Sequence, residues 1–187
     1  MLRPSRSDRT RWRLDRRSGY FFERWTIRDS RKWACRQATG RTLEVAVGTG
    51  LNLQWYPADI ELVAVDLDRE RLVIAAERAQ EMSRAVRLAV ADGHRLPFGP
   101  DTFETVVVTL AICAVDDRAA VLTEAHRVVR PGGLLLLVDH LEPRWRHGRP
   151  ATLGERVGFA VAERQRLWAG YFERVRLQKP RVLARRG

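Results

Sequence analysis

Short apolar runs alternate with longer amphipathic stretches over the central part of the chain, residues 42–140. The apolar runs are rich in Val and Leu, which is typical of strands buried on both faces of a parallel sheet. Between them, residues 68–82 and 118–129 repeat apolar positions at helical spacing, and residues 51–55 allow only a short helix. We predict strands at 43–47, 61–67, 86–92, 104–112 and 133–140. This alternation predicts an α/β fold with a doubly wound, mostly parallel sheet.

The N-terminal part of the chain has two different patterns. Residues 1–18 are polar and rich in arginine without periodicity, which predicts a basic, disordered arm. Residues 19–40 are predicted to form an amphipathic helix that ends at Gly40, because aromatic side chains recur there at roughly helical spacing. This helix would either fold over a ligand cleft as a lid or simply pack against the sheet. We expect residues 19–187 to form a single domain.

The C-terminal part is predicted to complete the sheet. A helix is expected over residues 151–168, followed by strands at 171–178 and 180–185. Because so few residues separate these two strands, we predict that they pair as an antiparallel hairpin at the sheet edge. The predicted sheet therefore has seven strands, with an antiparallel last strand.

Composition adds limits on location and on cysteine chemistry. The 187 residues are 45% hydrophobic, but no apolar run is long enough to span a membrane. No apolar segment follows the N-terminal arginines, so no secretory signal is predicted and we expect a cytoplasmic protein. Cys35 and Cys113 are far apart and lack a CxxC partner, so they are expected to be reduced and buried rather than disulfide-bonded or zinc-bound.

The formal net charge of +11 is unevenly distributed. Residues 1–40 and residues 141–187 each hold 12 basic and 4 acidic side chains, whereas residues 41–140 hold 10 basic and 15 acidic ones. Basic ends that carry tryptophans would suit nucleic acid, an anionic membrane surface or an acidic substrate. A simpler explanation is that arginine is the usual surface cation of this protein, because only two of its cations are lysines.

The ends of the predicted strands carry the candidate chemistry, because ligands of such sheets bind beyond the carboxyl ends of the strands. The first strand runs into Gly48 and Gly50, which permit a tight turn and a close approach to the backbone. A dinucleotide fingerprint would need a third glycine where the chain has Leu53. Glu44, inside the same strand, needs either a cationic ligand group or a nearby backbone donor as its partner.

Two aspartates end the next two strands. Asp66 can accept hydrogen bonds from both hydroxyls of a ribose, and the alternative role of helix cap suits Asp68 better. Asp92 can accept a hydrogen bond from the exocyclic amine of an adenine. The two carboxylates together predict a site for an adenosine group.

Over residues 42–140 the chain resembles the class I S-adenosylmethionine-dependent methyltransferases, a family that includes ubiquinone and menaquinone C-methylases. The resemblance rests on LEVAVGTG, AVDLD, ADGHRLPFGPDTFETVVVTLAI and VVRPGGLLLLVDH. It implies a Rossmann-like fold, S-adenosyl-L-methionine as cofactor, and methyl transfer to a small quinone, phenol, lipid or amine. The cofactor-binding residues that it implies are Glu44, Ala46, Gly48, Gly50, Asp66, Leu67, Asp92, Gly93 and Thr109. Ala46 stands where the family has its first glycine, so affinity for the cofactor would be reduced.

Methyl transfer is a direct displacement and needs a general base only if the acceptor must lose a proton. Candidates just beyond the fourth and fifth strands are Thr109, Cys113, Asp116, Asp139 and His140. We select His140 as the catalytic candidate because an imidazole titrates near neutrality. No HExxH motif or ligand cluster predicts a metal.

Two alternatives stay open. The arginine-rich ends would also suit a protein that binds or methylates nucleic acid, although TLAI stands after the fourth strand in place of an NPPY-type motif. The second alternative is an inactive homologue that binds the cofactor without turnover.

Overall fold

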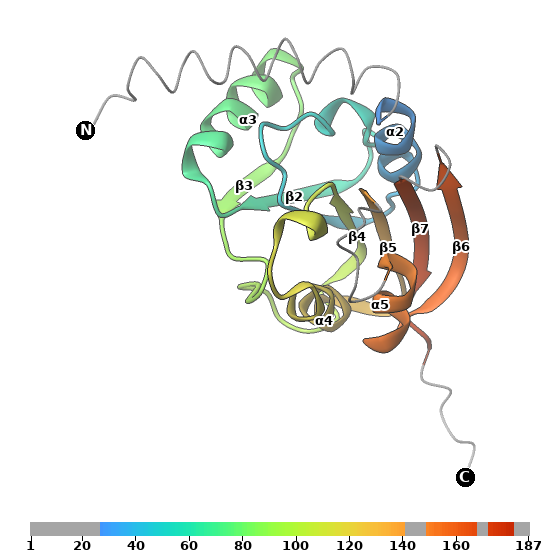
Figure 1. Ribbon diagram of the computed structural model, residues 1–187. Helices are drawn as coiled ribbons and strands as arrows, with labels where there is room; N and C mark the ends of the chain where they lie inside the picture. The colour runs from blue at the N-terminus through green and yellow to red at the C-terminus, as the bar shows by residue number, and fades with distance from the viewer. Residues whose placement is uncertain (1–26, 141–148, 168–171, 182–187) are drawn as a thin grey trace.

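A seven-stranded sheet forms the centre of the molecule, with helices on both faces (Figure 1). The computed structural model describes residues 27–140, 149–167 and 172–181, so the predicted basic arm lies outside the described residues. The strand order is β3-β2-β1-β4-β5-β7-β6, with every pair from β3 to β5 parallel and β7 antiparallel to both neighbours. The strands are β1 (Arg41–Val45), β2 (Glu61–Asp66), β3 (Arg87–Val90), β4 (Phe103–Thr109), β5 (Val129–His140), β6 (Ala160–Leu167) and β7 (Phe172–Gln178). The predicted doubly wound α/β fold with an antiparallel last strand is confirmed.

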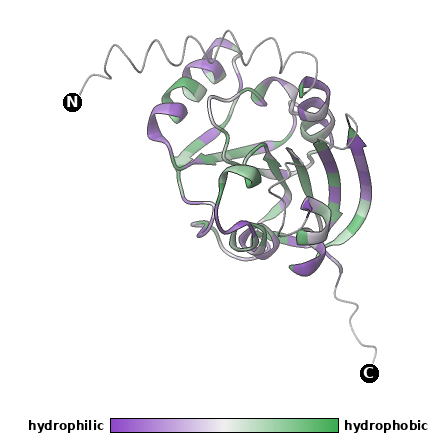
Figure 2. Cartoon of the chain, viewed as in Figure 1, coloured by the Kyte–Doolittle hydropathy of each residue, from purple (hydrophilic) through white to green (hydrophobic). Residues whose placement is uncertain are grey.

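Helices cover the sheet because its central strands are apolar on both faces. On one face lie α2 (Arg28–Arg36), the 3₁₀ turn η1 (Leu53–Trp55) and α3 (Arg69–Glu81). On the other lie α4 (Arg118–Val128) and α5 (Pro150–Arg156), and η2 (Ile112–Ala114) follows β4. Hydrophobic residues concentrate in the central strands and hydrophilic ones on the outer faces of the helices (Figure 2). Two separate apolar clusters, one on each face, therefore form the core.

The predicted helix over residues 151–168 is wrong in its second half. Helix α5 ends at Arg156, and Gly158 has a φ of 105°, a conformation that favours glycine. Residues 160–167 then form the edge strand β6, whose side chains alternate between exposed and half-buried. Pairing with β7 along the whole strand outweighs the helical preference of its Ala, Glu, Arg and Gln residues.

The predicted hairpin between residues 171–178 and 180–185 is also corrected. Strand β7 is paired with β5 on one side and with β6 on the other, so no edge is left for a later segment. Residues 180 and 181 are not in a strand, and residues 182–187 lie outside the described part of the chain.

The described part of the predicted N-terminal helix packs against the sheet. In α2, Ala34 and Cys35 are fully buried above strands β4 and β5. Residues 19–26 lie outside the described residues, so a lid formed by them stays a prediction. Cys35 is buried as predicted, whereas Cys113 is only half-buried, and neither cysteine forms a disulfide bond. Within the described residues, no helix is sufficiently long and apolar to cross a bilayer.

Candidate functional site

The direction of winding reverses between β1 and β4, and the candidate residues lie at the carboxyl edge beside this point. Val45, at the end of β1, is in register with Val65 of β2 and with Val108 of β4. Asp66 and Thr109 each follow the partner residue by one position, so both lie at the same edge as the loop after β1. This is where open α/β sheets bind their ligands.

The loop that follows β1 is held in left-handed conformations. Ala46, Gly48 and Gly50 have φ values of 58°, 57° and 77°. This conformation costs a residue with a Cβ about 1–2 kcal/mol, so Ala46 is strained. Its side chain is exposed, so the extra methyl group does not disturb the core.

The two glycines of this loop differ in what surrounds them. A Cβ on Gly50 would lie 2.8 Å from the Leu53 side chain and 3.2 Å from the backbone of Ala75, so packing alone requires glycine there. A Cβ on Gly48 would meet nothing within 4 Å. The bare face of Gly48 is therefore open to a ligand.

Asp66 both braces this loop and retains acceptor capacity. It is almost fully buried, and its Oδ2 accepts a hydrogen bond of 2.7 Å from the Gly48 N–H. Its Oδ1 accepts one of 2.9 Å from the Asp68 N–H. Because each carboxylate oxygen has two acceptor positions, both can still accept a ribose hydroxyl. Asp68 caps α3 by accepting from two backbone N–H groups, as predicted.

Asp92 follows β3, is exposed, and accepts hydrogen bonds from its own loop. Its Oδ1 accepts a hydrogen bond of 2.9 Å from the His94 N–H and lies 2.7 Å from His94 Nδ1. The backbone N–H and the imidazole of His94 lower the pKa of this carboxyl. Both contacts use Oδ1, which leaves Oδ2 for an adenine amine. Gly93 has a packing role, because a Cβ there would lie 3.2 Å from the Val45 side chain.

Leu67 provides apolar surface beside these carboxylates. Its side chain is 69% exposed although it directly follows buried Asp66. An exposed large apolar residue at a ligand-binding edge suits contact with a flat ring. Asp66 and Leu67 at the end of β2 lie beside the end of β3, which Asp92 follows, and the binding of an adenosine group by these residues stays a prediction.

The loop after β3 is fixed by two side chains from α4. Glu124 accepts a hydrogen bond of 2.8 Å from the Leu96 N–H, and Arg127 donates to the carbonyls of Leu96 and Phe98. Arg127 also donates two hydrogen bonds of 2.7 Å to Glu124 and lowers the pKa of that carboxyl. This ion pair holds the segment that follows Asp92.

Glu44 belongs to a buried network that the sequence analysis missed. Its Oε1 accepts a hydrogen bond of 2.6 Å from the Asn52 side-chain amide, which also donates to Thr109 Oγ1 at 2.8 Å. Arg31 of α2 donates to Asn52 Oδ1 at 2.9 Å and to Thr109 Oγ1 at 3.1 Å. The partner of Glu44 is thus a side-chain amide and not the cationic or backbone group that was expected. In the sequence, only the need of a buried carboxylate for a hydrogen-bond donor pointed to this network.

The pKa of Glu44 is raised to about 7, and the main cause of this shift is burial. The hydrogen bond from Asn52 and the charge of Arg31 act in the opposite direction. Burial therefore favours the protonated carboxyl over a pH range in which a free glutamate is ionised.

The candidate bases occupy different environments. Asp139 is fully buried and its Oδ2 accepts a hydrogen bond of 3.0 Å from the Cys113 N–H, whereas Asp116 is exposed. Thr109 takes part in the buried network. His140 is the last residue of β5, but its side chain lies outside the described part of the structure. Its catalytic role stays a prediction.

Metal binding gains no support from the described residues, which contain no group of three side chains able to hold a metal ion.

Comparison of the sequence with known proteins identifies relatives of this chain. A family model described as a methyltransferase domain matches residues 43–137, about half of the chain. A phosphatidylethanolamine N-methyltransferase of Cereibacter sphaeroides is 37% identical over 103 residues, which are 54% of this chain and 51% of that protein. A ubiquinone/menaquinone biosynthesis C-methyltransferase of Geotalea daltonii is 30% identical over 112 residues, covering 57% and 48%. The chain therefore spans about half the length of these curated relatives.

Solved structures agree with the fold. A S-adenosylmethionine-dependent methyltransferase of Aquifex aeolicus superposes with a TM-score of 0.63 at 18% identity, over 74% of this chain and 81% of that one. At this identity the likeness concerns the fold alone.

Proposed function

Because the chain belongs to the class I S-adenosylmethionine-dependent methyltransferases, we propose that it transfers a methyl group from S-adenosylmethionine to a small, lipid-soluble acceptor. The observation that carries this proposal is the open face of Gly48 beside the carboxylates of Asp66 and Asp92. The two relatives named above carry names that refer to a phospholipid amine and to quinones. Both kinds of acceptor dissolve in membranes.

In this proposal, each part of the cofactor would have a partner among the described residues. The loop at Gly48 would hold the methionine part, Asp66 the ribose hydroxyls, and Asp92 Oδ2 the adenine amine, with Leu67 against the ring. When bound, S-adenosylmethionine supplies a methyl group already activated by a sulfonium.

The protein then mainly positions the acceptor, since proximity and orientation can lower a barrier by about 7–11 kcal/mol. No nucleophilic side chain is required. Proton removal by His140 and location in the cytoplasm both stay predictions from the sequence.

Calorimetry with S-adenosylhomocysteine, the product form of the cofactor, tests the site. We expect the wild-type chain to bind it, and Asp92→Asn to weaken binding about tenfold or more, because hydrogen bonds to charged groups contribute about 1.5–3 kcal/mol. Asp66→Asn should weaken binding at least as much, since this carboxylate also braces the loop. Asp59→Asn, in an exposed loop, is the matched control and should bind like the wild type.

Failure of the wild-type chain to bind S-adenosylhomocysteine would reject the assignment. The acceptor is tested separately, by following labelled methyl transfer from S-adenosylmethionine to phosphatidylethanolamine and to a menaquinol. Cofactor binding with transfer to neither, but transfer to a water-soluble amine or phenol, would contradict the lipid-soluble acceptor.

A further inference from the structure

The exposed side of α2 carries a row of cations. Arg28, Lys32 and Arg36 are spaced at intervals of four residues, so they lie on one side of the helix. The opposite side buries Ser30 and Ala34. Arg28 and Arg36 are exposed to solvent, and Lys32 is half-buried.

Two tryptophans, from α2 and η1, and two arginines of β7 lie close to this helix. The Arg28 guanidinium lies 5.2 Å and the Lys32 ammonium 5.9 Å from the centre of the Trp55 ring. On the other side of α2, the Arg174 guanidinium lies 5.2 Å from the Trp33 ring, and Arg176 donates to the Gln37 side chain at 3.4 Å. We call this surface the basic face; it consists of Arg28, Lys32, Arg36, Arg174, Arg176, Trp33 and Trp55.

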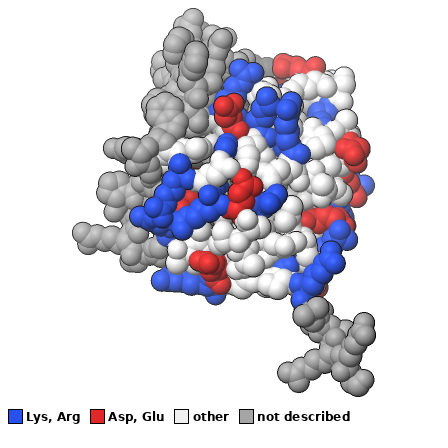
Figure 3. All heavy atoms as spheres, turned by 90° about the vertical axis from the view of Figure 1, so that its right-hand side faces the viewer, with Lys and Arg blue, Asp and Glu red and all other residues white. Residues whose placement is uncertain are grey.

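Few acidic side chains balance these cations. Asp29 is exposed on α2, and Glu163 of β6 lies 3.9 Å from Arg176. On the side of the molecule formed by β6 and β7, Lys and Arg gather with Asp and Glu between them (Figure 3). The five cations and two acids give the basic face a positive balance.

The basic face is adjacent to the candidate site. Arg31, on the inner side of the same helix, reaches Thr109 at the carboxyl end of β4 and Asn52 after the glycine loop. Trp55, in the basic face, follows Asn52 by three residues. A surface bound at the basic face would therefore lie next to the carboxyl edge where the acceptor must enter.

We propose that the basic face docks the protein on an anionic lipid bilayer, from which the acceptor is drawn; this rests on the proposed lipid-soluble acceptor. Tryptophans combine an apolar ring with a polar N–H and favour the boundary between lipid and water. Arginine and lysine side chains extend an apolar stem and keep the charge at the headgroups. Tryptophans flanked by cations therefore match an anionic leaflet better than a purely basic patch would.

Sedimentation of the full chain with vesicles tests this docking. We expect binding to vesicles of equal parts phosphatidylglycerol and phosphatidylcholine, little binding to phosphatidylcholine alone, and release by salt. Each cation near an anionic leaflet raises the partition coefficient about fivefold, so R28Q/K32Q/R36Q should lower it about a hundredfold. The control R87Q/R130Q/R156Q removes the same charge from the amino edge of the sheet and from α5, and should lower it much less.

Three results would overturn the proposal: equal binding to neutral vesicles, equal loss in the control, or single-stranded RNA binding that the α2 variant loses while vesicle binding is unchanged. Calorimetry with S-adenosylhomocysteine separates this proposal from the proposed function. Normal cofactor binding by the α2 variant, together with lost vesicle binding, supports docking. Absence of vesicle binding in a wild-type chain that binds the cofactor rejects docking alone.

Discussion

Glu44 is an acid in the middle of a parallel sheet, with only 1% of its surface exposed. Burial raises its pKa to about 7 from an ordinary value of 4.5. Between these two pH values the folded protein holds the proton and the unfolded chain releases it. Stability must therefore fall as the pH rises through this window, and then level off above the folded pKa.

We predict that Glu44→Gln removes this dependence. The wild-type free energy of unfolding should fall by about 3 kcal/mol relative to the variant between pH 4.5 and about 7, because one pH unit corresponds to 1.36 kcal/mol. Glutamine keeps an oxygen for the Asn52 amide, so the hydrogen bond survives. Urea titrations of both proteins at several pH values measure the difference; parallel pH profiles would show that Glu44 does not titrate in this range.

The site residues divide into those that sequence can predict and those that it cannot. Asp66 and Asp92 were predictable because the carboxyl ends of parallel strands meet at one edge. Arg31 and Asn52 were not, because their contacts with each other and with Thr109 span 21 to 78 positions along the chain. Only the three-dimensional packing of α2 brings them together.

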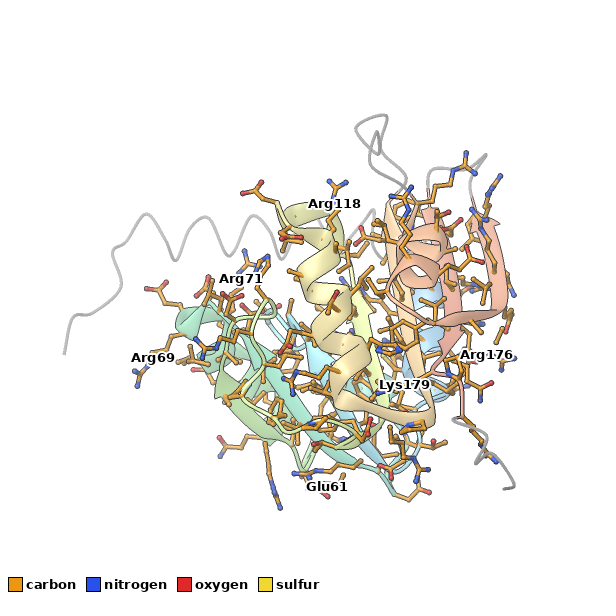
Figure 4. All side chains as sticks on the ribbon, turned by 90° about the horizontal axis from the view of Figure 1, so that it is seen from below. Glu61, Arg69, Arg71, Arg118, Arg176 and Lys179 are labelled. Atoms are coloured by element: carbon orange, nitrogen blue, oxygen red, sulfur yellow. The ribbon has the colours of Figure 1, made fainter. Side chains whose placement is uncertain are left out.

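At the scale of elements, Lys179 joins the end of β7 to the end of α4 (Figure 4). Its ammonium donates hydrogen bonds of 2.9 and 2.8 Å to the carbonyls of His126 and Val129, and one of 2.7 Å to Asp101. The side chain is only 15% exposed. A cation here also meets the negative end of the helix.

We predict that Lys179→Met destabilises the protein by about 2–3 kcal/mol, because two carbonyls and a carboxylate lose their donor. Lys32→Met is the matched control, since the ammonium of half-buried Lys32 lies 5.9 Å from the Trp55 ring, and this change should cost less than about 1 kcal/mol. Chemical unfolding of both variants provides the comparison. Equal losses would mean that the contacts of Lys179 contribute little.

The elements themselves were predictable where burial dictates the pattern. Strands β2, β4 and β5 contain unbroken apolar runs because helices cover both faces of the sheet there. Strand β6 was missed because AVAERQRL consists largely of helix-forming residues, and only its pairing with β7 decides its conformation. Gly158 was the available sign of a break in the helix.

Across the whole molecule, stability should be highest at the centre of the sheet. Residues 105–108 of β4 are fully buried between β1 and β5. Strand β3 has only four residues, of which three are exposed, and it forms one edge. Strand β4 contributes to both apolar clusters, with Val106 and Val108 on one face and Val107 on the other.

We therefore predict that amide hydrogen exchange is slowest in β4 and fastest, among the parallel strands, in β3. Exposed edge strands open locally, whereas central strands exchange only on global unfolding. Exchange followed by mass spectrometry of peptides from residues 87–90 and 103–109 measures this order. Equal protection of the two strands would contradict it.

The contacts of Arg31 also bear on where a fragment of this domain can begin. The family match begins at residue 43, yet Arg31 supplies donors to buried Asn52 and Thr109. A fragment starting at residue 43 would lack this guanidinium. It would also expose the apolar cluster to which Ala34 and Cys35 belong. Recombinant fragments and fusions intended to preserve the candidate site should retain at least residues 27–42 before the family match.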